Sequence, residues 1–425
     1  MIMHATGSAL VLRPLVLSFA HPRRFAGCKV LCSATVETKQ RVVPQTNDLL
    51  SPYKLKDFQL EHRIVLAPLT RCRAIGSVPQ PAAQEYYRQH TTKGGLLIAE
   101  ATCISTEGHG YPQTPGIYTQ DQIEAWRPVM DAVHEAGGVF FLQLWHCGRA
   151  SHPDFQPGGA LPLAPSALSI GPDWKVYTPS GKEEAYVVPQ AIDQQKIAEI
   201  VQQYADGARN AIAAGFDGVE IHGANGYIID QFLKTGSNHR TDEYGGPIEN
   251  RARFAMEVTR AVAEAVGPER TAIRLSPFTT FLDAIDEDPV ALGSYMAEQL
   301  NPLDLAYLHM VEPRVPSGAT EGDYDSSASL KPFREIYKGT FMVAGGFDRE
   351  LGIEAIRDGS ADLVAYGRLF LANPDLPERF ALDAPLNRYD RSTFYTFDQV
   401  KGYLDYPFLD QVDPDKAKEL AALAA

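Results

Sequence analysis

Eight short apolar runs recur between residues 64 and 367, and this recurrence limits the possible folds more than any other feature. Each run is bounded by Gly or polar residues and is too short for a helix, so we expect eight buried parallel strands. The runs are IVLA (64–67), LLIAEATCI (96–104), VFFLQLW (139–145), GVEIH (218–222), TAIRLS (271–276), LAYLHM (305–310), FMVAG (341–345) and LVAYG (363–367).

Helical patterns separate these runs. The clearest covers residues 193–214, where Asp193 is a suitable N-cap and Gly215 a suitable stop. Further helices are expected at 248–266, 120–136, 289–300, 348–358 and 373–381. Strands that alternate with helices form either a closed barrel or an open doubly wound sheet. Because no G-x-G-x-x-G motif follows the first run, we predict an α/β fold with a single-domain (βα)8 TIM barrel.

The N-terminal segment differs in composition from the rest of the chain. Residues 1–36 contain four basic residues and no Asp or Glu, although the whole chain has a net charge of −14. This composition is typical of a cleavable transit peptide, with a secretory signal as the alternative because residues 11–20 are apolar. The motif VLCSA (30–34) favours a plastid over a mitochondrion. Without a functional transit peptide, we expect the protein in the cytoplasm.

The remaining chain is divided into two predicted parts. Residues 37–410 form the barrel, and residues 411–425 form a C-terminal tail. Within the barrel, residues 147–190 are rich in Pro and Gly and lack periodicity, so we expect a long loop over the barrel mouth.

Charge and cysteine content exclude several classes of protein. The acidic balance argues against nucleic acid and against an anionic membrane surface as partners. No apolar run is long enough to span a membrane. Outside residues 1–36, the three cysteines Cys72, Cys103 and Cys147 are an odd number without tight spacing. They fit a reducing compartment better than a disulfide framework.

Active sites of such barrels lie at the carboxyl ends of the strands. The last two expected strands run into Gly345-Gly346 and Gly367-Arg368, a pattern that favours a phosphate site. No Lys stands at a strand end, which disfavours a Schiff-base aldolase, and no carboxylates gather there for an Mg²⁺ site. No metal site is predicted, because His146, Cys147 and His152 lack zinc-ligand spacing. The amides, hydroxyls and imidazole suit a phosphorylated organic cofactor that becomes anionic in turnover.

One long block identifies a family resemblance. The stretch HGANGYIIDQFLKTGSNHRTDEYGGPIENRARF (222–254) strongly resembles the Old Yellow Enzymes, the FMN-dependent ene-reductases that include plant 12-oxophytodienoate reductases. Supporting matches are APLTRCRA (67–74), QLWHCGR (143–149), RLSPF (274–278) and YGRLFLANPDL (366–376). The resemblance covers about residues 48–410. It implies a single FMN-binding barrel that takes electrons from NADPH or NADH.

The resemblance also implies which residues contact the flavin. Thr70 would hydrogen-bond the flavin O4, Gln143 would hold the pyrimidine edge, and Arg274 near N1 and O2 would offset the negative charge of the reduced ring. The full implied set is Pro68, Leu69, Thr70, Ala101, Gln143, Arg274, Gly345, Gly346, Gly367 and Arg368.

The substrate side is implied in the same way. His222 and Asn225 would bind the substrate carbonyl, and Tyr227 would donate a proton. Hydride at Cβ puts negative charge on the carbonyl oxygen, which two hydrogen-bond donors stabilise, while a phenol can protonate Cα. Trp145, Phe281 and Tyr395 would shape the substrate pocket, and Arg314 would reach an acidic substrate.

The predicted function is therefore ping-pong reduction of α,β-unsaturated carbonyls or nitroalkenes, with oxylipins such as 12-oxophytodienoate as one candidate class. The substrate would be a small molecule, and the protein a monomer or homodimer. Two alternatives stay open. One is another FMN barrel such as a 2-hydroxy-acid oxidase, which needs a His base and Arg residues for a carboxylate. The other is a non-catalytic flavin-binding sensor or scaffold.

Overall fold

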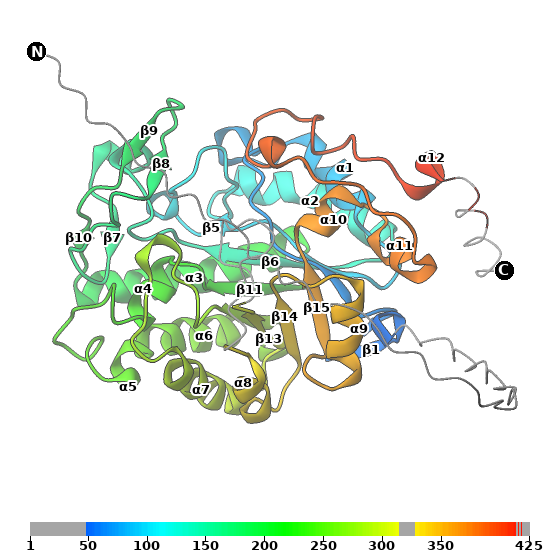
Figure 1. The fold of residues 1–425 in the computed structure, drawn as a ribbon. Coiled ribbons are helices and arrows are strands. Elements are labelled where there is room, and N and C mark those ends of the chain that lie inside the picture. Colours follow the sequence, from blue (N-terminus) through cyan, green and yellow to red (C-terminus); the bar gives the residue numbers. More distant parts are fainter. Residues whose placement is uncertain (1–47, 314–327, 414, 416–417, 419–425) are drawn as a thin grey trace, which may run out of the picture. The chain divides into compact units, whose positions relative to one another are not determined.

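The computed structural model describes residues 48–313 and 328–413, together with residues 415 and 418 (Figure 1). The expected transit peptide at 1–36, Arg314 and most of the expected tail lie outside the described residues.

Eight parallel strands close into a barrel, as predicted. They are β3 (Ile64–Leu66), β4 (Leu96–Ile98), β6 (Val139–Trp145), β11 (Gly218–Gly223), β12 (Thr271–Leu275), β13 (Tyr307–Val311), β14 (Phe341–Ala344) and β15 (Leu363–Tyr366). Each strand pairs with the next in this order, and β15 pairs with β3 to close the ring. A short strand β5 (Thr102–Cys103) extends the pairing at the end of β6. The prediction of a (βα)8 barrel is confirmed.

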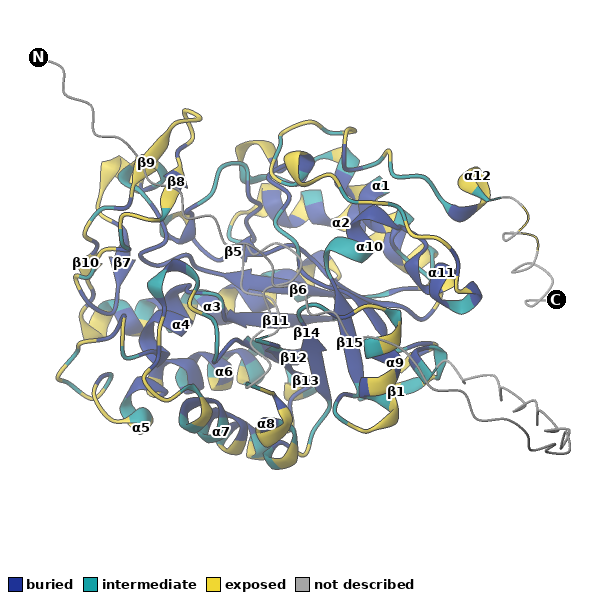
Figure 2. Ribbon diagram, viewed as in Figure 1, coloured by how far each residue is buried: buried dark blue, intermediate teal, exposed yellow. Residues whose placement is uncertain are grey.

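The longer helices surround the barrel and present their outer faces to solvent, whereas the barrel strands are buried (Figures 1 and 2). The helices of the described residues are α1 (Pro81–Gln89), α2 (Gln120–Glu135), α3 (Gln194–Ala214), α4 (Ile228–Leu233), α5 (Ile248–Arg251), α6 (Arg253–Val266), α7 (Pro289–Leu300), α8 (Lys331–Ile336), α9 (Arg349–Arg357), α10 (Arg368–Ala372), α11 (Leu376–Leu382) and α12 (Leu409–Val412). The N-cap and the stop residue expected for α3 are both observed. The Asp193 carboxylate accepts from the Lys196 N–H at 2.8 Å, and Gly215 ends the helix at φ 111°.

The helix predictions differ from the structure in detail. The pattern at 248–266 is divided into α5 and α6 at Ala252. Five helices, α1, α4, α8, α10 and α12, were not anticipated. In α4 all six residues are buried, so the helix lacks the alternation of polar and apolar faces by which a surface helix is detected.

The interior of the barrel is filled in layers. At the amino ends of the strands, the hairpin of β1 (Tyr53–Leu55) and β2 (Phe58–Leu60) packs Leu55 and Leu60 into the interior cluster. That cluster contains the large side chains Phe141, Tyr307 and Met342. This end of the barrel is therefore closed.

Closer to the carboxyl ends of the strands, the next inward-facing side chains are polar on one side of the barrel only. Four consecutive strands, β6, β11, β12 and β13, carry Gln143, Glu220, Arg274 and His309. Across the barrel, β14, β15 and the residue after β3 contribute the small side chains Ala344, Ala365 and Ala67. The barrel mouth thus has a polar wall that faces a wall of small residues.

The segment 147–190 is more ordered than the expected loop. It contains β7 (Leu163–Ala164), β8 (Lys175–Tyr177), β9 (Glu183–Ala185) and β10 (Gln190–Ala191). β8 and β9 form an antiparallel hairpin, and β7 pairs with β10. These strands of two or three residues are too short to show periodicity in the sequence. Ile170, Val176 and Tyr186 from this segment pack in one cluster with Trp145 and Tyr227, so the segment covers part of the mouth.

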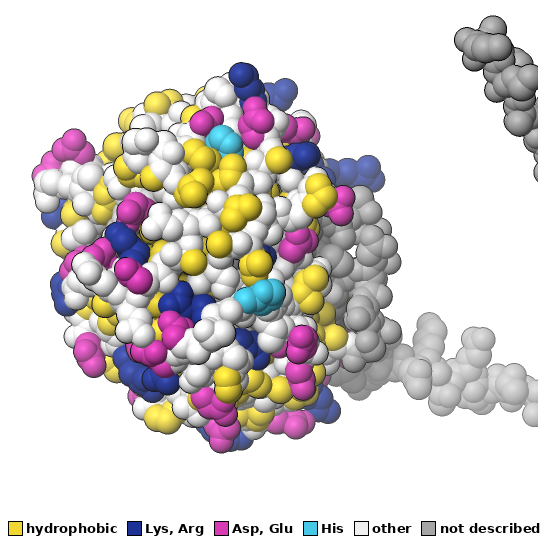
Figure 3. Space-filling view, turned by 90° about the vertical axis from the view of Figure 1, so that its left-hand side faces the viewer, with side chains coloured by type: hydrophobic (Ala, Val, Ile, Leu, Met, Phe, Trp, Pro, Cys, Tyr) yellow, Lys and Arg dark blue, Asp and Glu magenta, His cyan; other side chains and the backbone are white. Residues whose placement is uncertain are grey.

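On the face that carries β7–β10, hydrophobic, acidic and basic side chains are interspersed (Figure 3). None of the described helices is long and apolar enough to cross a membrane. Cys72, Cys103 and Cys147 are free thiols and all three are buried.

Candidate active site

His222, near the end of β11, is a buried neutral imidazole. Burial lowers its pKa well below 6.5, and the positive charge of Arg274 lowers it further. The Ala224 N–H donates to His222 Nδ1 at 3.4 Å, so the proton of the neutral ring lies on Nε2. His222 can therefore donate a hydrogen bond from Nε2 without gaining or losing charge.

The turn after β11 holds Asn225 in a left-handed backbone conformation. Its φ is 58°, and that of Gly226 is 78°. The Asn225 N–H donates to Ser276 Oγ at 2.7 Å, and the Gly226 N–H donates to Asp230 Oδ2 at 2.8 Å. A Cβ on residue 226 would lie 2.6 Å from the Phe281 carbonyl oxygen, so only Gly fits there. Asn225 Oδ1 is buried and has no hydrogen-bond partner among the described residues.

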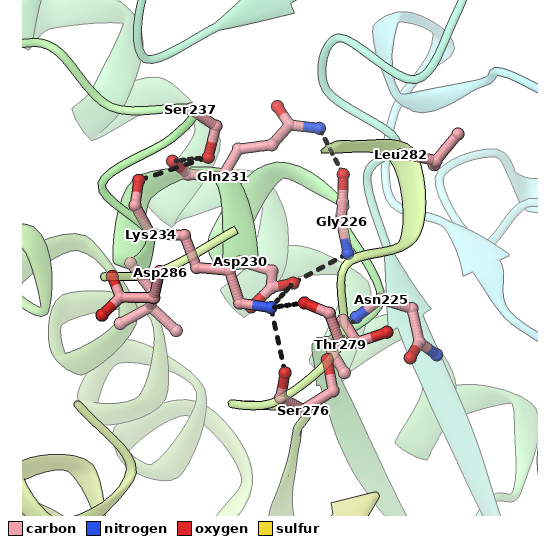
Figure 4. A network of polar contacts seen from close by, with 12 residues as sticks. Asn225, Gly226, Asp230, Gln231, Lys234, Ser237, Ser276, Thr279, Leu282 and Asp286 are labelled. Atoms are coloured by element: carbon pink, nitrogen blue, oxygen red, sulfur yellow. Dashed lines mark hydrogen bonds and ion pairs between the residues drawn. The ribbon is translucent and has the colours of Figure 1, made fainter. Parts of the chain in front are cut away.

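A network of buried polar contacts holds this turn in place (Figure 4). Lys234 Nζ lies 3.2 Å from Asp230 Oδ2 and donates to the carbonyl oxygens of Ser276 at 3.0 Å and Thr279 at 2.7 Å. Gln231 Nε2 adds a hydrogen bond to the Gly226 carbonyl at 2.8 Å. The network joins α4 to the end of β12, and the Asn225 side chain points away from Lys234.

Tyr227 lies within a group of aromatic rings. Its ring centre is 4.9 Å from those of both Trp145 and His222, in edge-to-face geometry. Its hydroxyl is 3.1 Å from the hydroxyl of Tyr111, whose ring stacks on Trp145 at 5.4 Å. Burial raises the Tyr227 pKa well above 10, so the phenol keeps its proton at neutral pH. Tyr186 is close enough to raise that pKa further.

The remaining residues expected in the substrate pocket differ in their exposure to solvent. Phe281 begins a 3-10 turn after β12, and its ring meets Trp174 edge-on at 4.8 Å. Tyr395 belongs to the C-terminal segment, is 66% exposed, and still influences the Tyr227 pKa. Arg314, the fourth expected residue, lies outside the described residues.

Four of the expected flavin-contacting residues follow the first two barrel strands. Pro68, Leu69 and Thr70 come directly after β3, and Ala101 follows β4. Leu69 approaches the loop after β15, because a Cβ on Gly367 would lie 3.2 Å from Leu69 Cδ2. These residues form the side of the mouth opposite the polar wall.

The positive charge of the polar wall is the guanidinium of Arg274. Arg274 is half-buried, and within the described residues its Nε has no hydrogen-bond partner. The neighbouring Gln143 is buried, and its Nε2 donates to Glu220 Oε1 at 2.7 Å. A cation fixed beside an amide can bind the polar edge of a ring that carries negative charge.

The loops after β14 and β15 carry the residues expected to bind an anion. Gly345 and Gly346 have φ values of 110° and 71°, which a side chain would strain. Arg368 follows Gly367, and its Nη1 lies 3.4 Å from the Tyr389 hydroxyl. Bare backbone N–H groups next to a guanidinium suit a phosphate. With Arg274 at the polar wall, these donors fit a phosphorylated flavin.

Sequence reasoning did not identify Tyr111, Tyr186, Glu220 or Ser276. Glu220 carried a signal, because it is a charged residue two positions before His222 on the same inward face of a buried strand. Tyr111 and Tyr186 lie in irregular segments, where the sequence gives no indication of their neighbours. Ser276 acts through a contact 51 residues away.

Comparisons with known proteins identify the family. The family model for the NADH:flavin oxidoreductase / NADH oxidase family matches residues 48–387. The chain is 58% identical over 368 residues to "12-oxophytodienoate reductase 1" of Oryza sativa subsp. japonica, which covers 86% of this chain and 94% of that protein.

Solved structures agree. Morphinone reductase aligns with a TM-score of 0.81 at 44% identity, over 87% of this chain and 99% of its own. Morphinone reductase in complex with tetrahydroNAD aligns with a TM-score of 0.79 at 45% identity, over 86% of this chain and 98% of its own. The chain therefore belongs to the NADH:flavin oxidoreductase / NADH oxidase family and is an FMN-dependent oxidoreductase.

Proposed function

We propose that this enzyme reduces the C=C bond of α,β-unsaturated carbonyl compounds with NADPH or NADH as the reductant. The observation that carries the proposal is the protonation of His222, near the end of β11, and of Tyr227, after that strand. A neutral imidazole with its proton on Nε2 and a protonated phenol stand within 4.9 Å, ring centre to ring centre, at one barrel mouth. The similarity to 12-oxophytodienoate reductases and morphinone reductase supports the same chemistry.

His222 and Asn225 act on the substrate carbonyl. As hydride reaches Cβ, negative charge develops on the carbonyl oxygen, and donors held in place stabilise it. His222 offers Nε2–H, and Asn225 offers the N–H groups of its side-chain amide. Both side chains stay neutral, so neither needs to transfer its own proton.

Tyr227 donates the proton to Cα. Burial keeps its pKa well above 10, which makes it protonated at the start of each cycle. The hydroxyl of Tyr111 lies 3.1 Å from that of Tyr227. It can donate a hydrogen bond to the Tyr227 oxygen after that oxygen has lost its proton. Trp145 fixes the tilt of the Tyr227 ring.

The cofactor residues would orient and bind FMN, which supplies the hydride when bound. Thr70 and Gln143 would hydrogen-bond the ring, Arg274 would offset the negative charge of the reduced ring, and Pro68, Leu69 and Ala101 would line it. Gly345, Gly346, Gly367 and Arg368 would hold the phosphate. The nicotinamide and the enone use the same pocket in alternation, so the kinetics are ping-pong.

Trp145, Phe281, Tyr395 and segment 147–190 shape the substrate pocket and select among substrates. Oxylipins such as 12-oxophytodienoate are a candidate class, and Arg314 binds the carboxylate of an acidic substrate. The enzyme works as a monomer or homodimer.

Product analysis tests the proposal directly. Purified enzyme with NADPH should convert 2-cyclohexenone to cyclohexanone and leave glycolate unchanged. Asn225→Ala should reduce turnover of cyclohexenone while the protein keeps its yellow FMN. Oxidation of glycolate would favour a 2-hydroxy-acid oxidase, and bound FMN without turnover of any enone would favour a non-catalytic flavin protein.

We also propose that residues 1–36 direct the protein to the plastid. The support is compositional, since this segment has Arg and Lys but no acidic residue. Residues 1–36 fused to a fluorescent reporter should reach plastids, and residues 37–425 fused to the same reporter should remain cytoplasmic. Mitochondrial or diffuse signal from the first fusion would contradict the plastid assignment.

A further inference from the structure

We propose that Glu220 is a positioning residue that orients Gln143 toward the flavin and limits how strongly Arg274 favours the reduced cofactor. The inference rests on the proposed contacts of Gln143 and Arg274 with FMN. The sequence marks Glu220 only as a charged residue in a buried strand, and its role emerges from its neighbours across the barrel.

The Glu220 carboxylate is completely buried and fully engaged. Its exposed fraction is 0%, and it accepts hydrogen bonds from Gln143 Nε2 at 2.7 Å and from His309 Nδ1 at 2.8 Å. In the barrel register Glu220 stands opposite Gln143, and Arg274 stands opposite His309. Glu220 is therefore the centre of the polar wall.

The charges of this wall can be assigned from the surroundings. Burial opposes ionisation of Glu220, but His309, Arg274 and Gln143 together keep its pKa below the ordinary value. Burial lowers the pKa of His309, so the ring is neutral and donates from Nδ1. The wall then holds one carboxylate and one guanidinium, with Tyr307 and His222 neutral beside them.

The first consequence concerns the orientation of Gln143. An amide can turn by 180° at little cost unless its two ends are distinguished. The carboxylate accepts only from the nitrogen end, so the Gln143 oxygen becomes the end that faces other partners. A fixed acceptor suits an N–H donor on the pyrimidine edge of the flavin.

The second consequence concerns redox balance. Arg274 stabilises negative charge on the reduced ring, and this attraction is weakened by the opposite charge of Glu220 in the same poorly screened wall. Removal of the carboxylate charge should therefore make the reduced flavin bind more tightly relative to the oxidised flavin.

Two substitutions separate these effects. Glu220→Gln keeps the size but removes the charge, and it should shift the ratio of dissociation constants in favour of reduced FMN by about tenfold. For a two-electron couple this shift raises the potential by about 30 mV. Glu220→Asp keeps the charge but shortens the side chain, so the carboxylate no longer reaches Gln143. This variant should leave the flavin potential near that of the parent protein and weaken binding of oxidised FMN.

Asp375→Asn is the matched control. Asp375 is also buried, with 3% exposure, and pairs with Arg379 at 2.6 Å, but it lies beside α11 away from the polar wall. This variant should lower thermal stability and leave the flavin potential unchanged.

The measurements are an anaerobic redox titration of each FMN-loaded protein and an FMN titration of each apoprotein. An unchanged or lowered potential in Glu220→Gln would overturn the redox role. Unchanged FMN affinity in Glu220→Asp would overturn the positioning role, even if Glu220→Gln fails to fold. No enone is present in either measurement, so a failure of the proposed function would be seen separately, in product analysis.

Discussion

His222, Asn225 and Tyr227 stand within six residues but differ in what each can do with a proton. Burial lowers the pKa of His222 and raises that of Tyr227, so both are uncharged. His222 and Asn225 can stabilise a developing oxyanion, while Tyr227 alone is a suitable acid. This division of roles can be tested one residue at a time.

Tyr227→Phe removes the acid and keeps the ring. General acids contribute roughly 10²–10⁴-fold, so reduction of a poorly activated enone should slow by about that range. Stopped-flow measurement of the oxidative half-reaction gives this rate. Flavin reduction by NADPH involves no such proton and is the internal control. If both half-reactions slow equally, Tyr227 has a structural role and the proton comes from elsewhere.

His222 should not titrate in the neutral range. Its pKa is held well below 6.5, so the ring stays neutral above that low value and its Nε2–H persists as the pH rises. Binding of a phenol that mimics the enolate should therefore follow the ionisation of the phenol, with no step near pH 6.5. Spectral titration of the oxidised enzyme over about pH 5.5–8 measures this. A step in the parent protein that is lost in His222→Asn would contradict a neutral His222.

At the scale of elements, the turn after β11 depends on the ion pair between Asp230 in α4 and Lys234, the residue that ends this helix. Asp230 caps the Gly226 N–H, and Lys234 binds both Asp230 and the end of β12. Both residues are buried, and their contacts fix the turn that carries Asn225 and Tyr227.

Lys234→Met leaves the Asp230 carboxylate buried without its cation. Loss of one partner of a buried pair costs about 3–5 kcal/mol, whereas an exposed pair contributes at most about 1 kcal/mol. Lys196→Met is the matched control, because Lys196 pairs with Glu199 on the surface of α3 at 2.7 Å. Denaturant unfolding of both variants should show a much larger loss for Lys234→Met. Equal losses would mean that the buried pair does not hold the turn.

The elements that could be predicted from sequence are those whose signal is local. All eight barrel strands were predicted because buried parallel strands are continuous apolar runs, and α3 was predicted because its caps and its apolar stripe agree. The helix α4 was missed because every face of it is buried. The β8–β9 hairpin was missed because its strands are too short to show alternation.

The site divides in the same way. His222 lies near the end of β11, and Asn225 and Tyr227 follow that strand, so the three could be grouped from the sequence and its family resemblance. Glu220 and Tyr111 gain their roles from Gln143, His309 and Tyr227, which reach them only after the barrel closes. Such contacts depend on strand register and on side-chain rotamers, which local patterns in the sequence do not reveal.

At the scale of the whole molecule, the C-terminal segment is fastened to the start of the barrel. Arg71 Nη2 donates to the Gly402 carbonyl at 2.6 Å, and Arg73 Nη2 donates to the Thr393 carbonyl at 3.1 Å. Tyr86 stacks on Tyr403 with ring centres 4.2 Å apart. These contacts secure the segment that carries Tyr395.

Glu100 lies beneath this junction and makes stability depend on pH. Burial raises its pKa from 4.5 to about 7, although the Arg71 N–H donates to it at 3.1 Å. The folded protein therefore binds this proton more tightly than the unfolded chain, and the free energy of unfolding should fall as pH rises from about 4.5 to 7. Glu100→Gln should flatten that decline in denaturant unfolding. A parent protein that gains stability from Glu100 over this range would contradict the assignment.

If the proposed function is right, 2-cyclohexenone accepts the electrons held by the reduced flavin. Anaerobic titration of the NADPH-reduced enzyme with 2-cyclohexenone measures this transfer, with flavin absorbance and product analysis as the readouts. We expect full reoxidation of the flavin, with one equivalent of cyclohexanone formed per FMN. A flavin that stays reduced in excess enone, yet reoxidises promptly when oxygen is admitted, would contradict it.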